Sequence, residues 1–167
     1  SYLIPVNVPL TAIIIIVIFT VINIHGVEEV GKSQALMVGI LLAILIVFTL
    51  NGLTIPKAQA FQLSSPTGPL GVIQATAFIF VVYLGAEAIG VAQAEIKTPE
   101  KTIPRAIFLS AVVLLVIYPL IAYAMFRIVP PEAISGESSP LIYVAQVSMG
   151  DLGKIALIIA GIIAALS

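Results

Sequence analysis

The sequence contains no cysteine, a single histidine and few charged residues. The absence of cysteine excludes disulfides, thiolate metal sites and thiol redox chemistry. Only 9% of the 167 residues are charged, whereas a soluble domain carries roughly 25%. The seven basic residues do not outnumber the eight acidic ones, and nucleic-acid binding requires a positive patch. We therefore expect neither a soluble domain nor a nucleic-acid partner, and no cofactor.

The chain is instead rich in apolar residues: 60% are hydrophobic and the mean hydropathy is +1.22. A bilayer core of about 30 Å requires about 20 helical residues to cross it. Lipid also forces the backbone into helices or a closed barrel, because no water is present to satisfy it. The apolar runs are long and do not alternate with a period of two, which argues against a barrel. The sequence predicts an all-α integral membrane protein, which we place in the plasma membrane.

Run length predicts a series of membrane spans separated by polar residues. We expect spans near residues 8–25, 34–55, 70–95, 104–127 and 153–167, with an outer loop at 128–152. Because the chain begins without methionine and ends within an apolar run, we interpret residues 1–167 as a fragment of one transmembrane domain. Three basic residues lie within nine positions at Lys97, Lys101 and Arg105. Since basic residues are enriched in cytoplasmic loops, we place this loop inside the cell.

One of these runs is interrupted, in the stretch "FIFVVYLGAEAIGVAQAEIKTPEKTIPRAI" at residues 78–107. An ionised acid at the centre of a bilayer costs about 2.5–3.5 kcal/mol, so Glu87 should face the bundle interior or a wet cavity. Gly85 and Gly90 each weaken a helix by about 1 kcal/mol relative to alanine. Unwound backbone is tolerated inside a membrane only where it meets protein, water or a ligand. Alternatively, the glycines only allow close helix packing, and Glu87 is a neutral structural acid.

The same stretch carries a pattern with several fixed points. An aromatic-rich run is followed by glycine, a small residue, glutamate, a second acid and a K-x-P-x-x-x-x-P segment. Here these are Phe80, Tyr83, Gly85, Ala86, Glu87, Glu95, Lys97, Pro99, Ile103 and Pro104. This pattern resembles the sixth helix and the following loop of the amino acid–polyamine–organocation (APC) superfamily of transporters.

The flanking segments extend this resemblance over nearly the whole chain, as helices four to eight. "INIHGVEEVGKSQ" resembles the loop between helices four and five, and "NGLTIPKA" the end of helix five. "SSPLIYVAQVSMGDLG" resembles the outer loop before helix eight. The resemblance implies a leucine-transporter-type bundle of two inverted five-helix repeats, partly present here, with a discontinuous sixth helix over residues 78–94.

The resemblance also implies a function: secondary active transport of amino acids or related amines by alternating access. Discontinuous helices form the substrate sites of such transporters. By position, the backbones of Val81 and Leu84 would hold the substrate ammonium, and the side chains from Phe80 to Ala86 would shape the pocket around Gly85. Relatives with large substrates often carry an aromatic gate near Val81. Its aliphatic side chain favours a small or apolar amino acid.

Further roles follow from the same resemblance. Glu87, with Tyr83 beside it, is the candidate for coupling or gating, and the alternative is that Glu87 braces the unwound segment. Glu95, Lys97 and Arg105 are candidates for ion pairs at an inner gate, against the alternative of a solvated charged loop. Ala164 and Ser167 match an Ala-x-x-Ser pattern that helps to bind sodium in some relatives. The coupling ion, proton or sodium, stays open.

Two other functional classes are compatible with a membrane protein. A channel-like or signalling membrane protein without transport is the alternative, but a channel calls for polar residues repeated along one helix face. An enzyme needs a nucleophile–base pair or a metal cluster, and the sequence contains no such constellation. We therefore expect no enzymatic activity, and a small amino acid or amine together with the lipid bilayer as partners.

Overall fold

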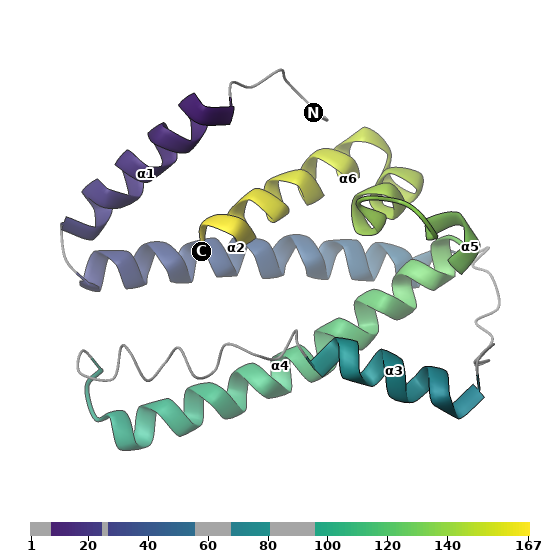
Figure 1. Ribbon diagram of the computed structural model, residues 1–167, viewed down its shortest axis with the longest axis horizontal. Helices are drawn as coiled ribbons and strands as arrows, with labels where there is room; N and C mark the ends of the chain where they lie inside the picture. Colours follow the sequence, from purple (N-terminus) through teal and green to yellow (C-terminus); the bar gives the residue numbers. More distant parts are fainter. Residues whose placement is uncertain (1–7, 25–26, 56–67, 81–95) are drawn as a thin grey trace.

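A computed structural model describes residues 8–24, 27–55, 68–80 and 96–167, and the regular structure in these ranges is entirely α-helical. The elements are α1 (Val8–Ile24), α2 (Val27–Thr54), α3 (Gly68–Phe80), α4 (Pro99–Ile128), α5 (Pro131–Ile134) and α6 (Pro140–Leu166) (Figure 1). The predicted all-α class is confirmed.

Three of the described helices are long and apolar enough to cross a bilayer: Gly31–Thr54 of α2, the whole of α4 and the whole of α6. At 1.5 Å per residue, the 24 residues of Gly31–Thr54 extend about 36 Å and the 30 residues of α4 about 45 Å, more than the roughly 30 Å of hydrocarbon core. Large apolar side chains cover their outer surfaces, as expected where lipid takes the place of water. The chain is part of an integral, multi-pass membrane protein.

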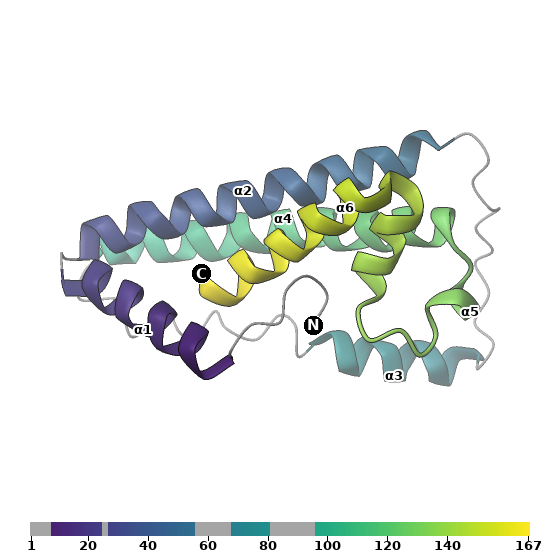
Figure 2. The same ribbon diagram turned by 90° about the horizontal axis from the view of Figure 1, so that it is seen from above.

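The helices α2, α3, α4 and α6 run in alternating directions along the chain, as consecutive membrane crossings must. α2 and α4 lie side by side and run the same way, whereas α6 packs against both and runs back (Figures 1 and 2). α3 lies between α2 and α4 in the chain and runs opposite to them (Figure 1). The amino-terminal ends of α2 and α4 therefore share one side of the bundle, and the cytoplasmic placement of that side stays a prediction.

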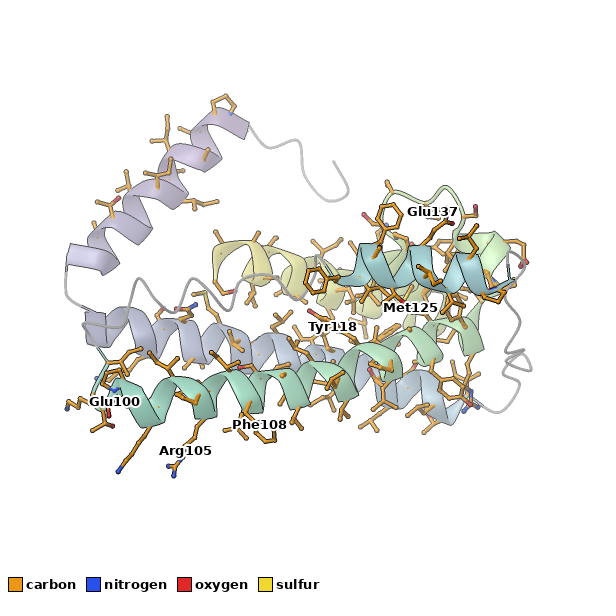
Figure 3. All side chains as sticks on the ribbon, turned by 60° about the horizontal axis from the view of Figure 1, so that its bottom comes forward. Glu100, Arg105, Phe108, Tyr118, Met125 and Glu137 are labelled. Carbon is orange, nitrogen blue, oxygen red and sulfur yellow. The ribbon has the colours of Figure 1, made fainter. Side chains whose placement is uncertain are left out.

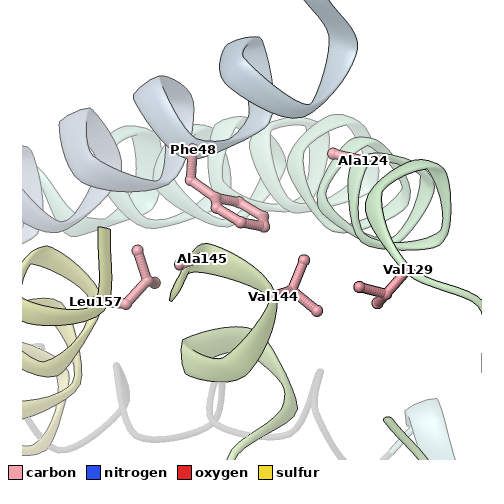
Figure 4. Packing of buried hydrophobic residues seen from close by; sticks show 6 residues of the cluster. All are labelled: Phe48, Ala124, Val129, Val144, Ala145 and Leu157. Carbon is pink, nitrogen blue, oxygen red and sulfur yellow. The ribbon is translucent and has the colours of Figure 1, made fainter. Parts of the chain in front are cut away.

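A small core lies where α2, α4 and α6 meet. Phe48 of α2 is fully buried and points toward α6, where it is surrounded by the other core residues (Figure 4). These residues are Ala124, Val129, Val144, Ala145 and Leu157. A fully buried aromatic ring makes many dispersion contacts, so Phe48 is the main packing residue of the three-helix unit.

Small residues let α2 and α4 cross closely. A Cβ atom built on Gly52 would lie 2.8 Å from the Cβ of Ala124 and 3.1 Å from Cδ1 of Ile128, closer than carbon atoms normally pack. Membrane helices associate through such small-residue contacts because lipid provides no hydrophobic drive between them. Gly52 and Ala124 thus fix the separation of α2 and α4.

The region predicted as the outer loop, residues 128–152, contains α5 and the first half of α6. α6 begins at Pro140 and changes direction at Gly150, whose φ of 68° and ψ of −155° are not helical. Val144 and Ala145, before this break, are buried in the core. The connection between the membrane spans is thus partly helical, because the apolar face of residues 140–149 packs into the core.

α4 also begins earlier than the expected span at 104–127. Pro99 occupies its first turn, and Thr98 precedes it with a left-handed φ of 53°. Proline suits the first turn because its missing N–H has no helical partner there. Pro104 lies inside the helix, where it leaves the carbonyl of Glu100 without its usual donor. Both residues are exposed, so water at this end of the helix can satisfy that carbonyl.

Candidate functional site

Most of the predicted substrate-binding segment lies outside the described residues. Phe80 is the last residue of α3 and its side chain is 65% exposed. The other predicted site residues between 81 and 95 are Val81, Tyr83, Leu84, Gly85, Ala86, Glu87 and Glu95, and the structure describes none of them. The discontinuity of the sixth helix therefore stays a prediction.

α3, which leads into that segment, stands apart from the packed unit of α2, α4 and α6. None of its residues is buried, and Figure 2 shows it separated from α2 and α4. Thr76 Oγ1 donates to the carbonyl of Val72 at 2.8 Å, a bond within the helix. Within the described chain, α3 is thus held less tightly than the three long helices, and its end at Phe80 adjoins the predicted break.

The predicted inner-gate loop is described from Ile96 onward. The carbonyl of Lys97 accepts hydrogen bonds from Thr98 Oγ1 at 2.7 Å and from Thr102 Oγ1 at 3.0 Å. These bonds tie the loop to the first turn of α4. The side chains of Lys97 and Arg105 are exposed, and Arg105 points away from the bundle (Figure 3). The structure does not bring these two side chains together, and the predicted partner Glu95 lies outside the described residues.

The candidate sodium ligands Ala164 and Ser167 are adjacent at the end of α6. Ser167 Oγ donates to the carbonyl of Ala164 at 3.4 Å, and Gln34 Nε2 of α2 donates to the Ser167 carbonyl at 3.1 Å. A cation could be shared by the hydroxyl and the Ala164 carbonyl if the hydroxyl proton rotated away. No group of three His, Cys, Asp or Glu side chains that could hold a metal occurs in the described part of the chain.

Sequence reasoning missed an apolar pocket of about 200 Å³ between α2 and α6. Its lining residues are Ala43, Ile44, Val47, Phe48, Met149, Ala156 and Leu157. None of them offers a charged or hydrogen-bonding side chain, so the ammonium and carboxylate of an amino acid would lose their solvation without compensation. The pocket is therefore not a candidate for binding the charged groups of a substrate. The alanines Ala43 and Ala156 were its only signal in the sequence.

Sequence reasoning also missed a contact between the carboxyl ends of α2 and α4, which we call the Arg127 clamp. Arg127 Nη2 donates to the carbonyl of Ile55 at 3.2 Å, and its guanidinium lies 5.8 Å from the centre of the Tyr123 ring. Ile55 follows the last residue of α2, and a cation is favourable at a helix carboxyl end. One turn earlier, the buried Asn51 Oδ1 accepts no hydrogen bond from any described residue. An arginine closing an apolar run was the available signal.

Apolar helices that alternate in direction along the chain, three of them long enough to cross a bilayer, and that pack through small residues define a helical, multi-pass membrane protein. The chain belongs to the amino acid permease family, whose sequence profile matches residues 5–167. This match confirms the resemblance to the APC superfamily, and with the helical structure it supports an APC-type bundle that is partly present here.

Individual relatives agree with this assignment. The chain is 32% identical over 149 residues to an uncharacterized protein of Methanocaldococcus jannaschii, covering 88% of this chain and 34% of that protein. It is 25% identical to the branched-chain amino acid permease BcaP of Lactococcus lactis, covering 84% and 32%. It is 31% identical to the methylthioribose transporter of Bacillus subtilis, covering 72% and 26%. The chain thus spans about a third of the length of the relatives that it matches.

Proposed function

We propose that the protein containing this chain is a secondary transporter that moves amino acids across the plasma membrane by alternating access. The observation that carries the proposal is the family match, which covers residues 5–167 and so includes the whole predicted break. The family consists of transporters, which is why we assign transport rather than catalysis or signalling. The parallel course of α2 and α4, with α3 following α2 in the chain and running the opposite way, supports the same interpretation (Figure 1).

The substrate we propose is a small or apolar amino acid. The aliphatic side chain of Val81 leaves no aromatic ring at the predicted gate on which a cationic side chain could stack. Two relatives are named branched-chain amino acid permeases, one from Lactococcus lactis and one from Bacillus subtilis. Another relative is named a methylthioribose transporter, so methylthioribose is the competing candidate for the substrate of this protein.

The proposed site is built on the end of α3. Backbone carbonyls of Val81 and Leu84 would accept hydrogen bonds from the substrate ammonium, and Phe80 and Ala86 would border the pocket. Glu87 would act in coupling or gating, because an acid inside a membrane is costly unless it serves a partner or a pathway. The packed unit of α2, α4 and α6 would act as the fixed support against which α3 moves.

For the coupling ion, the structure offers one testable pair of oxygens. Ser167 Oγ and the Ala164 carbonyl oxygen lie 3.4 Å apart, close enough to contact the same small cation. If sodium drives transport through this pair, Ser167→Ala should weaken the sodium dependence of uptake. If protons drive transport, replacing sodium by choline should leave uptake by the parent protein unchanged, and the Ser167→Ala variant should take up substrate like the parent in both media.

The test is uptake by the complete protein reconstituted in liposomes. Labelled leucine, valine and alanine should accumulate and compete with one another, whereas lysine and methylthioribose should compete poorly. Glu87→Gln should abolish or alter the dependence of uptake on pH between about pH 5 and about pH 8. Glu132→Gln is a matched control, because Glu132 is an exposed acid of the short helix α5.

Different failures have different meanings. Preferential uptake of methylthioribose would overturn the substrate class but keep transport. Unchanged uptake by Glu87→Gln across the pH range would remove Glu87 from the mechanism. No uptake or binding of any amino acid by a folded protein, with ion conductance in its place, would replace the transporter by the channel alternative.

A further inference from the structure

The outer face of α4 carries a continuous stripe that begins with two bases and continues with apolar side chains. Lys101, Arg105, Phe108, Val112 and Leu115 are spaced alternately by four and three residues, so they lie on one side of the helix. Phe108 is 68% exposed, Val112 42% and Leu115 63%. Figure 3 shows Arg105 and Phe108 pointing away from α2 and α6. We call these five residues the α4 stripe.

The opposite side of α4 makes the contacts with the bundle. Ala124 is fully buried, and Ile121 and Ile128 pack against the core cluster. These positions lie on the other side of the helix from the α4 stripe at 100° per residue. Within the described chain, the α4 stripe is therefore the face that the three-helix unit leaves open.

The dimensions of the α4 stripe match one leaflet of a bilayer. From Arg105 to Leu115 the helix rises about 15 Å, which is half of the roughly 30 Å hydrocarbon core. When Phe108, Val112 and Leu115 lie among acyl chains, Lys101 and Arg105 reach the level of the phosphates. Both bases lie on the side that we predict to be cytoplasmic.

The basic residues at the amino-terminal end of α4 favour a lipid with an anionic head group. Residues 96–105 contain three bases, Lys97, Lys101 and Arg105, and one acid, Glu100. Glu100 is exposed in the first turn and lies about 100° around the helix from Lys101. No ion pair joins Lys101 or Arg105 to another described residue. A guanidinium can form two parallel hydrogen bonds to a phosphate, and basic residues beside a membrane attract anionic lipids.

We propose that the α4 stripe binds an anionic phospholipid of the cytoplasmic leaflet. Lys101 and Arg105 hold the head-group phosphate, and an acyl chain lies along Phe108, Val112 and Leu115. The proposal rests on the cytoplasmic placement of the residues before α4, not on the identity of the transported substrate. It therefore survives if the proposed substrate is wrong.

The first test compares lipid affinities of the complete purified protein. Phosphatidylglycerol and phosphatidylcholine with identical acyl chains are titrated, and bound lipid is counted by native mass spectrometry. Phosphatidylglycerol should bind more tightly. Neutralising both bases in Lys101→Gln/Arg105→Gln should weaken its binding about 25-fold, at roughly fivefold for each base, while phosphatidylcholine binding stays the same.

Two controls separate lipid recognition from folding and from net charge. Lys101→Arg/Arg105→Lys keeps both charges and should bind phosphatidylglycerol within about twofold of the parent. Lys154→Gln removes one base from α6, away from the α4 stripe, and should also leave the affinity unchanged. Equal phosphatidylglycerol affinity in the parent and in the Lys101→Gln/Arg105→Gln variant would overturn the proposal.

The second test identifies the occupant in the native membrane. A photo-reactive phenylalanine analogue at position 108 should cross-link to phospholipid upon illumination. Cross-links to another segment of the protein, or to a second copy, would show that polypeptide covers the α4 stripe and would also overturn the proposal.

Discussion

The close crossing of α2 and α4 predicts that Gly52→Ala separates or strains the two helices. The added Cβ would lie 2.8 Å from Ala124 Cβ, whereas carbon atoms pack at about 3.5–4.0 Å. Overpacking of this kind typically costs about 1–3 kcal/mol. Alanine also favours a helix by about 1 kcal/mol over glycine. The free energy of unfolding therefore falls by less in Gly52→Ala than the cost of the contact alone.

Gly39→Ala on the same helix provides the matched control. A Cβ on Gly39 would meet no described atom within 4 Å, so this variant gains the helix propensity without the clash. The difference in the free energy of unfolding between Gly52→Ala and Gly39→Ala therefore measures the cost of packing the added methyl group against α4. We expect this cost to be about 1–3 kcal/mol. Equilibrium unfolding of the complete protein in mixed micelles, followed by circular dichroism, measures both variants.

A double-mutant cycle tests the assignment to Ala124. Removing its methyl group in Ala124→Gly should make Gly52→Ala tolerable, with a favourable coupling of about 1–3 kcal/mol between the two sites. Equal stability of Gly52→Ala and Gly39→Ala, or a coupling near zero in the cycle, would refute the close approach of α2 and α4 at this point.

The other predictions concern the core, the break in α6, the Arg127 clamp and α3. Phe48→Ala should lower the free energy of unfolding by about 3–5 kcal/mol, measured in the same unfolding assay; a loss below that of a surface substitution would contradict its buried position. Gly150→Ala should cost about 1–3 kcal/mol because a φ of 68° with a ψ of −155° is a conformation that essentially only glycine adopts, whereas Gly161→Ala, inside the helix with open space around it, should be neutral or stabilising. Arg127→Gln should cost about 1 kcal/mol by removing the bond to the Ile55 carbonyl, and Arg105→Gln should change stability by less than about 0.5 kcal/mol. Hydrogen exchange of the complete protein should be faster in the amides of α3 than in those around Phe48, since α3 has no buried residue; equal protection would contradict a loosely held α3.

The membrane class could be predicted from run length alone, but the helix ends could not. α2 starts at Val27, before the expected span at 34–55, because polar residues such as Glu28 and Lys32 can continue a helix beyond the hydrocarbon. Run length measures the apolar part of a helix, whereas caps and prolines set its ends. Both Pro99 and Pro104 suit a first turn, and only the structure shows that α4 begins at Pro99.

The first half of α6 was missed for a different reason. The outer loop expected at 128–152 includes this segment, although Leu141, Val144 and Ala145 have the spacing of a helix face. A single glycine with positive φ turns the helix without ending it. Beyond it, a Cβ on Gly153 would come within 2.6 Å of the Ala145 carbonyl oxygen, so the two halves of α6 fit closely at the turn.

The candidate site can be predicted only as a pattern, because its proposed chemistry depends on backbone groups rather than on a distinctive set of side chains. Val81, Leu84 and Gly85 contribute nothing ionisable, and Glu87 is meaningful only through its place in an apolar run. The structure adds the support around that pattern. α2, α4 and α6 share a buried core at Phe48 and a close crossing at Gly52, whereas α3 buries nothing. Alternating access, the mechanism that we propose, requires one element to move against another, and on the basis of this packing difference we propose that α3 moves against the three-helix unit.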